Sequence, residues 1–231
     1  MIIYLLNIFA KAIIAQFIAE ASLDSKQADP IGTIASHIFA MELYHWNGIS
    51  LIDILLAKMH VVCPVLFGIW GSEATNEGKI KLGWWRVEKG GPFLSDQGHS
   101  DRMTGLGRGF AALALRNYEK TKLNNPYPAY HYWRSFSFIV NVPPSARTST
   151  HCVVLRAMIE NFEERFLMFF GDAALVALRY AVLEYPRGVK KGMGQMALAG
   201  LADTMRKVSL SQFALPLLVW SLSANPEFSI G

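Results

Sequence analysis

The sequence is poor in cysteine, in charge and in polar repeats, and each shortage excludes a class of protein. Two cysteines in 231 residues, Cys63 and Cys152, are too few for a disulfide framework, so we expect reduced thiols in an intracellular protein. Charged residues make up 17% of the chain and hydrophobic residues 52%, a balance that excludes a disordered tail. The length allows one large domain or two small ones.

The motifs of several enzyme classes are also missing. There is no Walker lysine motif, no Gly-x-Ser-x-Gly elbow and no His-Glu-x-x-His motif. Gly105, Gly107 and Gly109 form Gly-x-Gly-x-Gly, which departs from the dinucleotide fingerprint, so we expect close helix packing there. Acidic side chains cluster only on one predicted solvated helix face, at Glu160, Glu163 and Glu164. We therefore expect a binding surface and no catalytic residues.

Two His and Cys pairs have spacings that raise the question of a metal or nucleophile site. His60 and Cys63 have a His-x-x-Cys spacing, but a closed zinc site needs four ligands and no second pair follows, so we expect no metal site. His151 and Cys152 are adjacent, so on a helix their side chains point about 100 degrees apart and do not share a proton. A core or capping role is the favoured interpretation for this pair.

The charge balance permits an anionic partner without requiring one. The formal net charge is +4 and the pI is about 9.1. The densest basic stretch consists of Arg187, Lys190, Lys191, Arg206 and Lys207. Glycines interrupt this stretch, which favours a solvated connection over a phosphate track. Direct RNA binding is kept as an alternative function.

The N-terminal stretch from Met1 to Leu23 is long and apolar enough to raise the question of a membrane span. Four polar side chains interrupt it, at Asn7, Lys11, Gln16 and Glu20. A lysine in the middle of a spanning helix costs about 2.5 to 3.5 kcal/mol, so we expect a buried helix with one polar edge and no stable membrane insertion. The apolar stretch 213–222 is too short to span and contains Pro216.

Hydrophobic periodicity predicts helices along most of the chain. We expect helices over residues 1–23, from Pro30 to Trp46, from a cap at Ser50 to Pro64, and over 102–120 and 130–140. From Thr150 to Phe170 an apolar stripe predicts one continuous helix, ended by Gly171, and a further helix runs to Pro186. The only strand signal is a surface stretch at residues 80–87.

These segments predict an all-α, HEAT-like antiparallel helical stack, with residues 1–231 in a single domain. The long exception is a Gly- and Trp-rich loop at residues 67–98, which contains Trp70, Trp84 and Trp85. A loop of this length in a compact domain is often functional. Its tryptophans either fold back on the helices or form an exposed docking surface.

An ordered series of short motifs carries a family resemblance. The motifs are Leu56-Ala57-Lys58, Cys63-Pro64, Gly83-Trp84, Asp101-Arg102-Met103 with Gly105, Asn125-Pro126-Tyr127-Pro128, His131-Tyr132-Trp133-Arg134, Asn141-Val142-Pro143-Pro144, Thr150-His151, Val154-Leu155 and Phe170-Gly171. In this order they resemble the C-terminal domain of the Gle-one family of nuclear-pore mRNA-export mediators, and the fungal members in particular. The resemblance covers about Tyr4 to Arg206.

The resemblance implies an all-helical, HEAT-like domain at the cytoplasmic face of the nuclear pore, in the nucleus and cytoplasm. Members of the family bind a DEAD-box ATPase and stimulate it, so the domain is an activator and not an enzyme. In fungal members inositol hexakisphosphate bridges the two proteins, and an FG-nucleoporin docks on the domain. The family is also linked to translation factors, so a helical scaffold for initiation and termination factors is the alternative function.

Lys11 and Lys58 resemble positions of the basic pocket that holds the polyphosphate in the family. Ammonium groups make short, charge-assisted contacts with phosphate, whereas the alternative is lysines that snorkel from the edges of buried helices. Val61 and Val62 replace a lysine pair of many fungal relatives, so we expect lower affinity for inositol hexakisphosphate.

Relatives also carry helices upstream of the point that matches Met1. We therefore expect this domain to be truncated on its N-terminal side. A missing helix would leave an apolar face uncovered on the first helix, at Ile3, Leu6, Phe17 or Ile18.

Overall fold

The computed structural model describes residues 1–212, with the backbone alone for residue 204 and residues 206–212. The helices are α1 (Ile2–Gln16), α2 (Ser25–Ala40), α3 (Asp53–Val62), α4 (Asn76–Lys81), α5 (Asp96–Ala114), α6 (Tyr130–Val140), α7 (Ser149–Ile159), α8 (Glu163–Arg179) and α9 (Met193–Gln212). Short π or 3-10 turns are η1 (Phe17–Ala21), η2 (Glu42–Tyr44), η3 (Pro64–Phe67), η4 (Pro144–Ala146), η5 (Tyr180–Glu184) and η6 (Tyr185–Gly188). The all-α prediction is confirmed.

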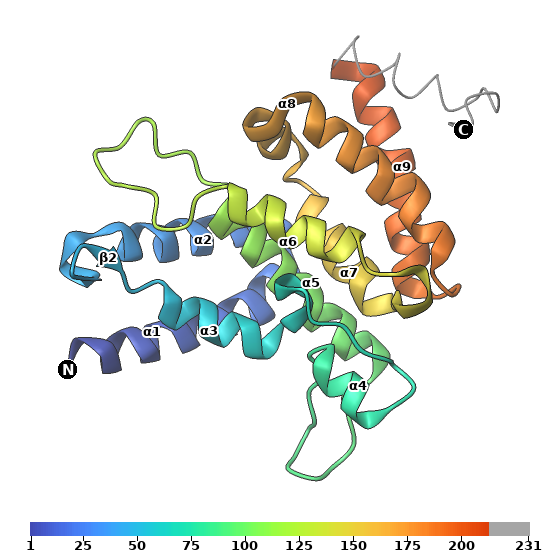
Figure 1. Cartoon of the computed structure of the whole chain (residues 1–231), viewed down its shortest axis with the longest axis horizontal. Coiled ribbons are helices and arrows are strands. Elements are labelled where there is room, and N and C mark those ends of the chain that lie inside the picture. The colour runs from blue at the N-terminus through green and yellow to red at the C-terminus, as the bar shows by residue number, and fades with distance from the viewer. Residues whose placement is uncertain (213–231) are drawn as a thin grey trace.

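Helix α5 lies at the centre of the molecule and packs against α2, η1 and α7 (Figure 1). Its core side chains Met103, Leu106 and Phe110 are completely buried, and between them small residues let neighbouring backbones approach closely. On one side α1 packs against α3, and on the other α7 packs against α9. One hydrophobic core runs through these helices, from Leu6 in α1 to Ala202 in α9.

Helix α6 has the predicted bounds, whereas α2, α3 and α5 differ from prediction. Helix α2 begins at Ser25, capped by Asp24, whose side chain accepts a hydrogen bond from the Lys26 amide at 2.9 Å, and Pro30 lies inside the helix. Ser50 does not cap α3 in the predicted way, because Ile52 is the N-cap residue. Helix α5 begins at Asp96, six residues before the predicted start, because Ser95 caps it.

The predicted continuous helix from Thr150 to Phe170 is wrong. Helix α7 ends at Ile159 and α8 begins at Glu163, with Asn161 between them in the left-handed region at φ 69°. Asparagine tolerates this conformation better than most residues. The break predicted at Gly171 is present, because Gly171 has non-helical dihedral angles, with φ 54° and ψ −134°, and two helical stretches of α8 meet there across a kink.

The region 67–98 is more ordered than the predicted loop. It contains α4 and a β-bridge between Arg86 and Phe93, so the strand signal at 80–87 corresponds to one paired residue. A two-residue hairpin, β1 (His45–Trp46) with β2 (Ile49–Ser50), was not predicted. Its turn places Asn47 and Gly48 at positive φ, which asparagine and glycine accept.

The structure contains long apolar helical stretches that bear on the question of membrane insertion. Two helical stretches, Ile2–Ala21 and Glu163–Gly188, are long and apolar enough to cross a membrane by length and composition, and 28% of each tested window is buried. Core helices of soluble proteins pass the same test, so the absence of membrane insertion stays a prediction. The expectation of a buried helix with one polar edge is wrong for the start of α1, where Ile3 is exposed together with its neighbours Tyr4 and Leu5. Leu6 and Phe17 are buried in the core, and Ile18 is partly buried against it. The stretch 213–222 lies outside the described residues, as does part of the predicted single domain.

Candidate functional site

The two lysines expected to hold a polyphosphate lie on neighbouring helices. Lys11 is on α1 and Lys58 is on α3, and these two helices pack against each other (Figure 1). Lys11 is exposed and Lys58 is partly exposed. Within residues 1–212, no hydrogen bond or ion pair engages either ammonium group. Both charges therefore remain available to an anionic ligand.

The valines that follow Lys58 on α3 differ in their surroundings. Val61 is 69% exposed, whereas Val62 is partly buried and packs against the core. A lysine is compatible with the first position, because its charge would stay in water. The second position would bring the stem of a lysine against apolar side chains.

His60 and Cys63 do not converge on one site. The His60 ring packs at a tilt against Phe67, with ring centroids 4.9 Å apart, whereas Cys63 is completely buried. Burial raises the pKa of the Cys63 thiol to about 12, which disfavours the thiolate that a metal needs. In the described part of the chain, no group of three or more His, Cys, Asp or Glu side chains is arranged to hold a metal ion.

His151 has the predicted capping role. Its Nδ1 accepts a hydrogen bond from the Thr148 amide at 3.2 Å and lies 2.8 Å from the Thr148 hydroxyl, which forms a capping box at the start of α7. Cys152 is buried, and burial raises the pKa of its thiol to about 12. The adjacent pair therefore stabilises a helix end.

A second polar cluster at this helix end was missed in the sequence. The Glu73 carboxylate accepts hydrogen bonds from the Thr150 amide at 3.1 Å and from its hydroxyl at 2.9 Å. His99 lies 2.9 Å from the same hydroxyl and stacks on Trp84 at 3.9 Å. Because the Thr150 hydroxyl donates to Glu73, it accepts from His99, so this histidine is no base toward the threonine. In the sequence, the only local signal for this cluster was the threonine at position 150, near the predicted start of a helix.

Burial lowers the pKa of His99 to about 3, and the nearby Arg102 and Lys79 act in the same direction. The ring is therefore neutral at physiological pH, and Trp84 is buried beside it. Through the contacts of Glu73 with Thr150, the cluster connects the 67–98 region to α7. Of the three tryptophans considered as a docking surface, Trp84 folds back on the helices, whereas Trp70 and Trp85 are 49% and 53% exposed.

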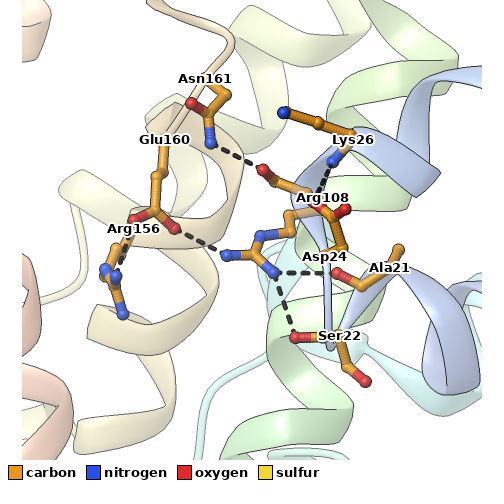
Figure 2. Close-up of polar contacts among 9 residues, drawn as sticks. Ala21, Ser22, Asp24, Lys26, Arg108, Arg156, Glu160 and Asn161 are labelled. Carbon is orange, nitrogen blue, oxygen red and sulfur yellow. Dashed lines mark hydrogen bonds and ion pairs between the residues drawn. The ribbon is translucent and has the colours of Figure 1, made fainter.

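The predicted solvated acidic face is wrong at Glu160. This side chain is 22% exposed and pairs with Arg108 at 2.9 Å and with Arg156 at 2.7 Å (Figure 2). Burial raises the pKa of Glu163 to about 6. Only Glu164 has the expected exposed position.

An open groove along α6 was also missed. Two hollows of about 410 and 580 Å³ share Arg134 and Phe138, one lying toward α3 and the other toward Trp70. Their walls include several aromatic side chains, and the rings of Tyr127 and His131 are stacked with centroids 4.2 Å apart. The aromatic composition of residues 130–138 was the available signal. Such a groove suits apolar side chains of a partner.

Among the described side chains of the basic stretch that could bind RNA, Arg187 forms an ion pair. Arg187 pairs with Glu184 at 2.8 Å in an exposed position, and Lys190 and Lys191 are exposed in the connection before α9. This agrees with a solvated connection. The side chains of Arg206 and Lys207 lie outside the description.

Comparisons with known proteins complete this description. A family described as GLE1-like protein matches residues 1–182. The chain is 48% identical over 206 residues to the mRNA export factor GLE1 of Chaetomium thermophilum and 23% identical over 215 residues to that of Saccharomyces cerevisiae. These alignments cover 89% and 91% of this chain and 39% of each relative, so the chain spans about two fifths of their length.

Among solved structures, a complex from S. cerevisiae described as a Dbp5 C-terminal domain variant bound to Gle1 and IP6 matches with a TM-score of 0.77. The match has 23% sequence identity and covers 87% of this chain and 68% of that chain, which shows a shared fold. The family match extends over well more than half of the 231 residues, from α1 into η5. This chain belongs to the GLE1-like protein family.

Proposed function

We propose that this chain is a non-catalytic activator that binds a DEAD-box RNA-dependent ATPase and stimulates it during mRNA export. The carrying observation is the family match over residues 1–182. The fold shared with a protein solved with Dbp5 and IP6 supports the same proposal. The place of action is the cytoplasmic face of the nuclear pore. FG-nucleoporin and translation-factor binding are proposals that rest on the family resemblance alone.

Inositol hexakisphosphate is the proposed bridging ligand, and Lys11 and Lys58 are its proposed contacts on this chain. Their ammonium groups lie on packed helices and have no ion pair among the described residues. Charge-assisted contacts with phosphate are about twice as strong as neutral hydrogen bonds. The chemistry that the ligand supplies is a dense negative charge shared between two positively charged surfaces. The valines at 61 and 62 reduce the number of contacts and so weaken binding.

The test is the RNA-stimulated ATPase rate of the matching DEAD-box protein, with and without this chain, at zero and saturating inositol hexakisphosphate. We expect stimulation by the chain. The double variant Lys11→Ala/Lys58→Ala should raise the ligand concentration for half-maximal stimulation by at least about tenfold, because two charge-assisted contacts are lost.

The matched control is Lys120→Ala/Lys122→Ala, which removes the same charge from two exposed lysines in the loop before α6. It should leave the ligand dependence unchanged. Val61→Lys should lower the ligand concentration required, because this exposed position accepts a charge. If the chain gives no stimulation both without ligand and at saturating ligand, activation is contradicted. Equal effects of the two double variants would contradict only the placement of the pocket.

A further inference from the structure

The segment from Lys79 to Phe93 carries cations that have no acidic partner. It contains four basic residues, Lys79, Lys81, Arg86 and Lys89, and one acidic residue, Glu88. None of the four basic side chains forms an ion pair within the described part of the chain. Lys81 and Lys89 are exposed. Lys81 and Lys89 therefore present unneutralised positive charge to solvent. Lys79 and Arg86 are partly buried, and the Lys79 ammonium lies 4.8 Å from the centroid of the Trp84 ring.

After the end of α4, backbone hydrogen bonds hold the rest of this segment as a hairpin-like loop that leads to α5 (Figure 1). The Leu94 amide donates to the Trp85 carbonyl at 2.9 Å, and the Val87 amide donates to the Pro92 carbonyl at 3.2 Å. The Arg86 guanidinium lies 4.0 Å from the centroid of the Phe93 ring. The charges are thus displayed on an ordered loop, which lowers the entropy cost of binding.

Trp85 adds an exposed aromatic surface to these charges. Its neighbour Trp84 is buried against His99, whereas Trp85 is 53% exposed. The guanidinium of Arg102, on α5, lies 5.0 Å from the Trp85 ring centroid. Arg102 is only partly exposed, has no carboxylate partner among the described residues, and its buried Nε has no hydrogen-bond partner. A guanidinium in such a position normally pairs with an anion.

We propose that this surface, formed by Lys79, Lys81, Trp85, Arg86, Lys89 and Arg102, binds single-stranded RNA. Bases stack on exposed aromatic rings with little sequence preference, and lysines and arginines contact the phosphates. The cations follow one another along a loop and a helix, which suits a chain of phosphates. An acidic peptide would use the charges but would leave the flat face of the indole without a stacking partner. This activity goes beyond activation of an ATPase, because the chain itself holds RNA.

The experiment titrates the whole chain into a fluorescein-labelled 12-nucleotide oligouridylate and follows anisotropy at about 50 and 200 mM KCl. We expect saturable binding that weakens with salt. Trp85→Ala should weaken binding by about tenfold, because one stacked base is lost, and Trp85→Tyr should restore most of it. Circular dichroism verifies that each variant is folded, and the exposed position of Trp85 favours this.

The charges are tested separately with Lys81→Ala/Lys89→Ala, which changes two exposed side chains. For single strands the slope of log affinity against log salt is about −0.7 per phosphate contact, so this variant should be shallower by about 1.4. Lys120→Ala/Lys122→Ala is the control with the same change of charge, and it should retain the slope of the parent chain.

The proposal is overturned if the parent chain gives no anisotropy change at about 50 mM KCl. Equal weakening by the two lysine pairs would show non-specific attraction and would also overturn it. Binding that Trp85→Ala does not weaken, and that polyglutamate competes as well as unlabelled oligouridylate, would point to an acidic peptide instead. No ATPase is present in this assay, so its outcome is independent of the proposed activation.

Discussion

At the scale of single residues, the glycines of α5 set how closely the central helix approaches its neighbours. A Cβ atom at Gly105 would lie 2.1 Å from the carbonyl oxygen of Phe17, and one at Gly109 would lie 2.3 Å from the Phe17 ring. Phe17 is completely buried. The Gly-x-Gly-x-Gly motif is therefore a packing motif, as the sequence predicted.

Gly105→Ala should lower the free energy of unfolding by about 3 kcal/mol, because the added methyl group meets backbone of η1 and forces the two elements apart. Urea unfolding monitored by circular dichroism measures this change. The control is Gly200→Ala in α9, where none of the described atoms lies within 4 Å of the new Cβ atom. It should raise stability by about 0.5 kcal/mol, because alanine favours the helix. Unchanged stability of the Gly105 variant would contradict this account of the packing.

At the scale of elements, the Arg108 and Glu160 pair joins three separate parts of the chain (Figure 2). Arg108, on α5, donates hydrogen bonds to the carbonyl groups of Ala21 and Ser22 at 2.9 and 3.1 Å, where η1 ends. Its other terminal nitrogen pairs with Glu160, where α7 ends. Nearby, the Asn161 side chain donates to the Ser25 hydroxyl at 2.9 Å. These contacts fix the break between α7 and α8 against the start of α2.

Glu160→Gln should lower the free energy of unfolding by about 2 kcal/mol, because it leaves the guanidinium of Arg108, whose side chain is 11% exposed, without its carboxylate. Thermal and urea unfolding measure the loss. The matched control is Glu184→Gln, whose ion pair with Arg187 is 49% and 72% exposed. That change should cost less than about 0.5 kcal/mol. If the control variant loses as much stability as Glu160→Gln, burial does not explain the stabilisation by the Arg108–Glu160 pair.

The same elements show how far the sequence predicts the fold. Helix α6 lies between prolines, which are local signals, and its bounds were predicted. The break at Asn161 was not, because Ile159, Phe162 and Phe166 are all buried and their spacing continues a helical stripe. The contacts that stabilise the break involve residues 52 or more positions apart, such as Arg108 and Glu160. Local periodicity contains no information about such contacts.

For the candidate sites, the sequence likewise identified some of the residues but not their tertiary surroundings. Lys11 and Lys58 were identified through family resemblance, whereas their lack of ion pairs is a tertiary property. Arg102 stood in a quoted motif, but its position over Trp85 depends on how the 79–93 loop folds back on α5. The composition gives a pI near 9.1, but it does not indicate which lysines and arginines lack an ion pair in the folded chain.

At the scale of the whole molecule, ion pairs connect α2 near the start of the chain with α8 near its end. Asp29 on α2 binds Arg116, just after α5, at 2.7 Å, and Arg165 on α8 at 2.5 Å. Burial acts to raise the pKa of Asp29, but the two guanidinium groups outweigh it and hold this pKa below 3.8. The stabilisation from this carboxylate is therefore present above pH 3.8 and is lost as the pH falls through its lower folded-state pKa.

Glu163, at the start of α8, contributes to the pH dependence of stability with the opposite sign. Burial raises its pKa from 4.5 to about 6, so its favourable contribution is complete below pH 4.5 and is lost as the pH rises through about 6. Glu163→Gln should therefore raise the free energy of unfolding by about 1 kcal/mol near pH 7.5 and change it little near pH 4, because glutamine resembles the protonated acid. Urea unfolding of the parent and the variant at both pH values measures the difference. Glu164→Gln, on the next and exposed residue, is the control and should show no such dependence on pH. An equal change at both pH values would mean that the variant acts through packing, and the burial of this carboxyl group would then not govern how α8 responds to pH.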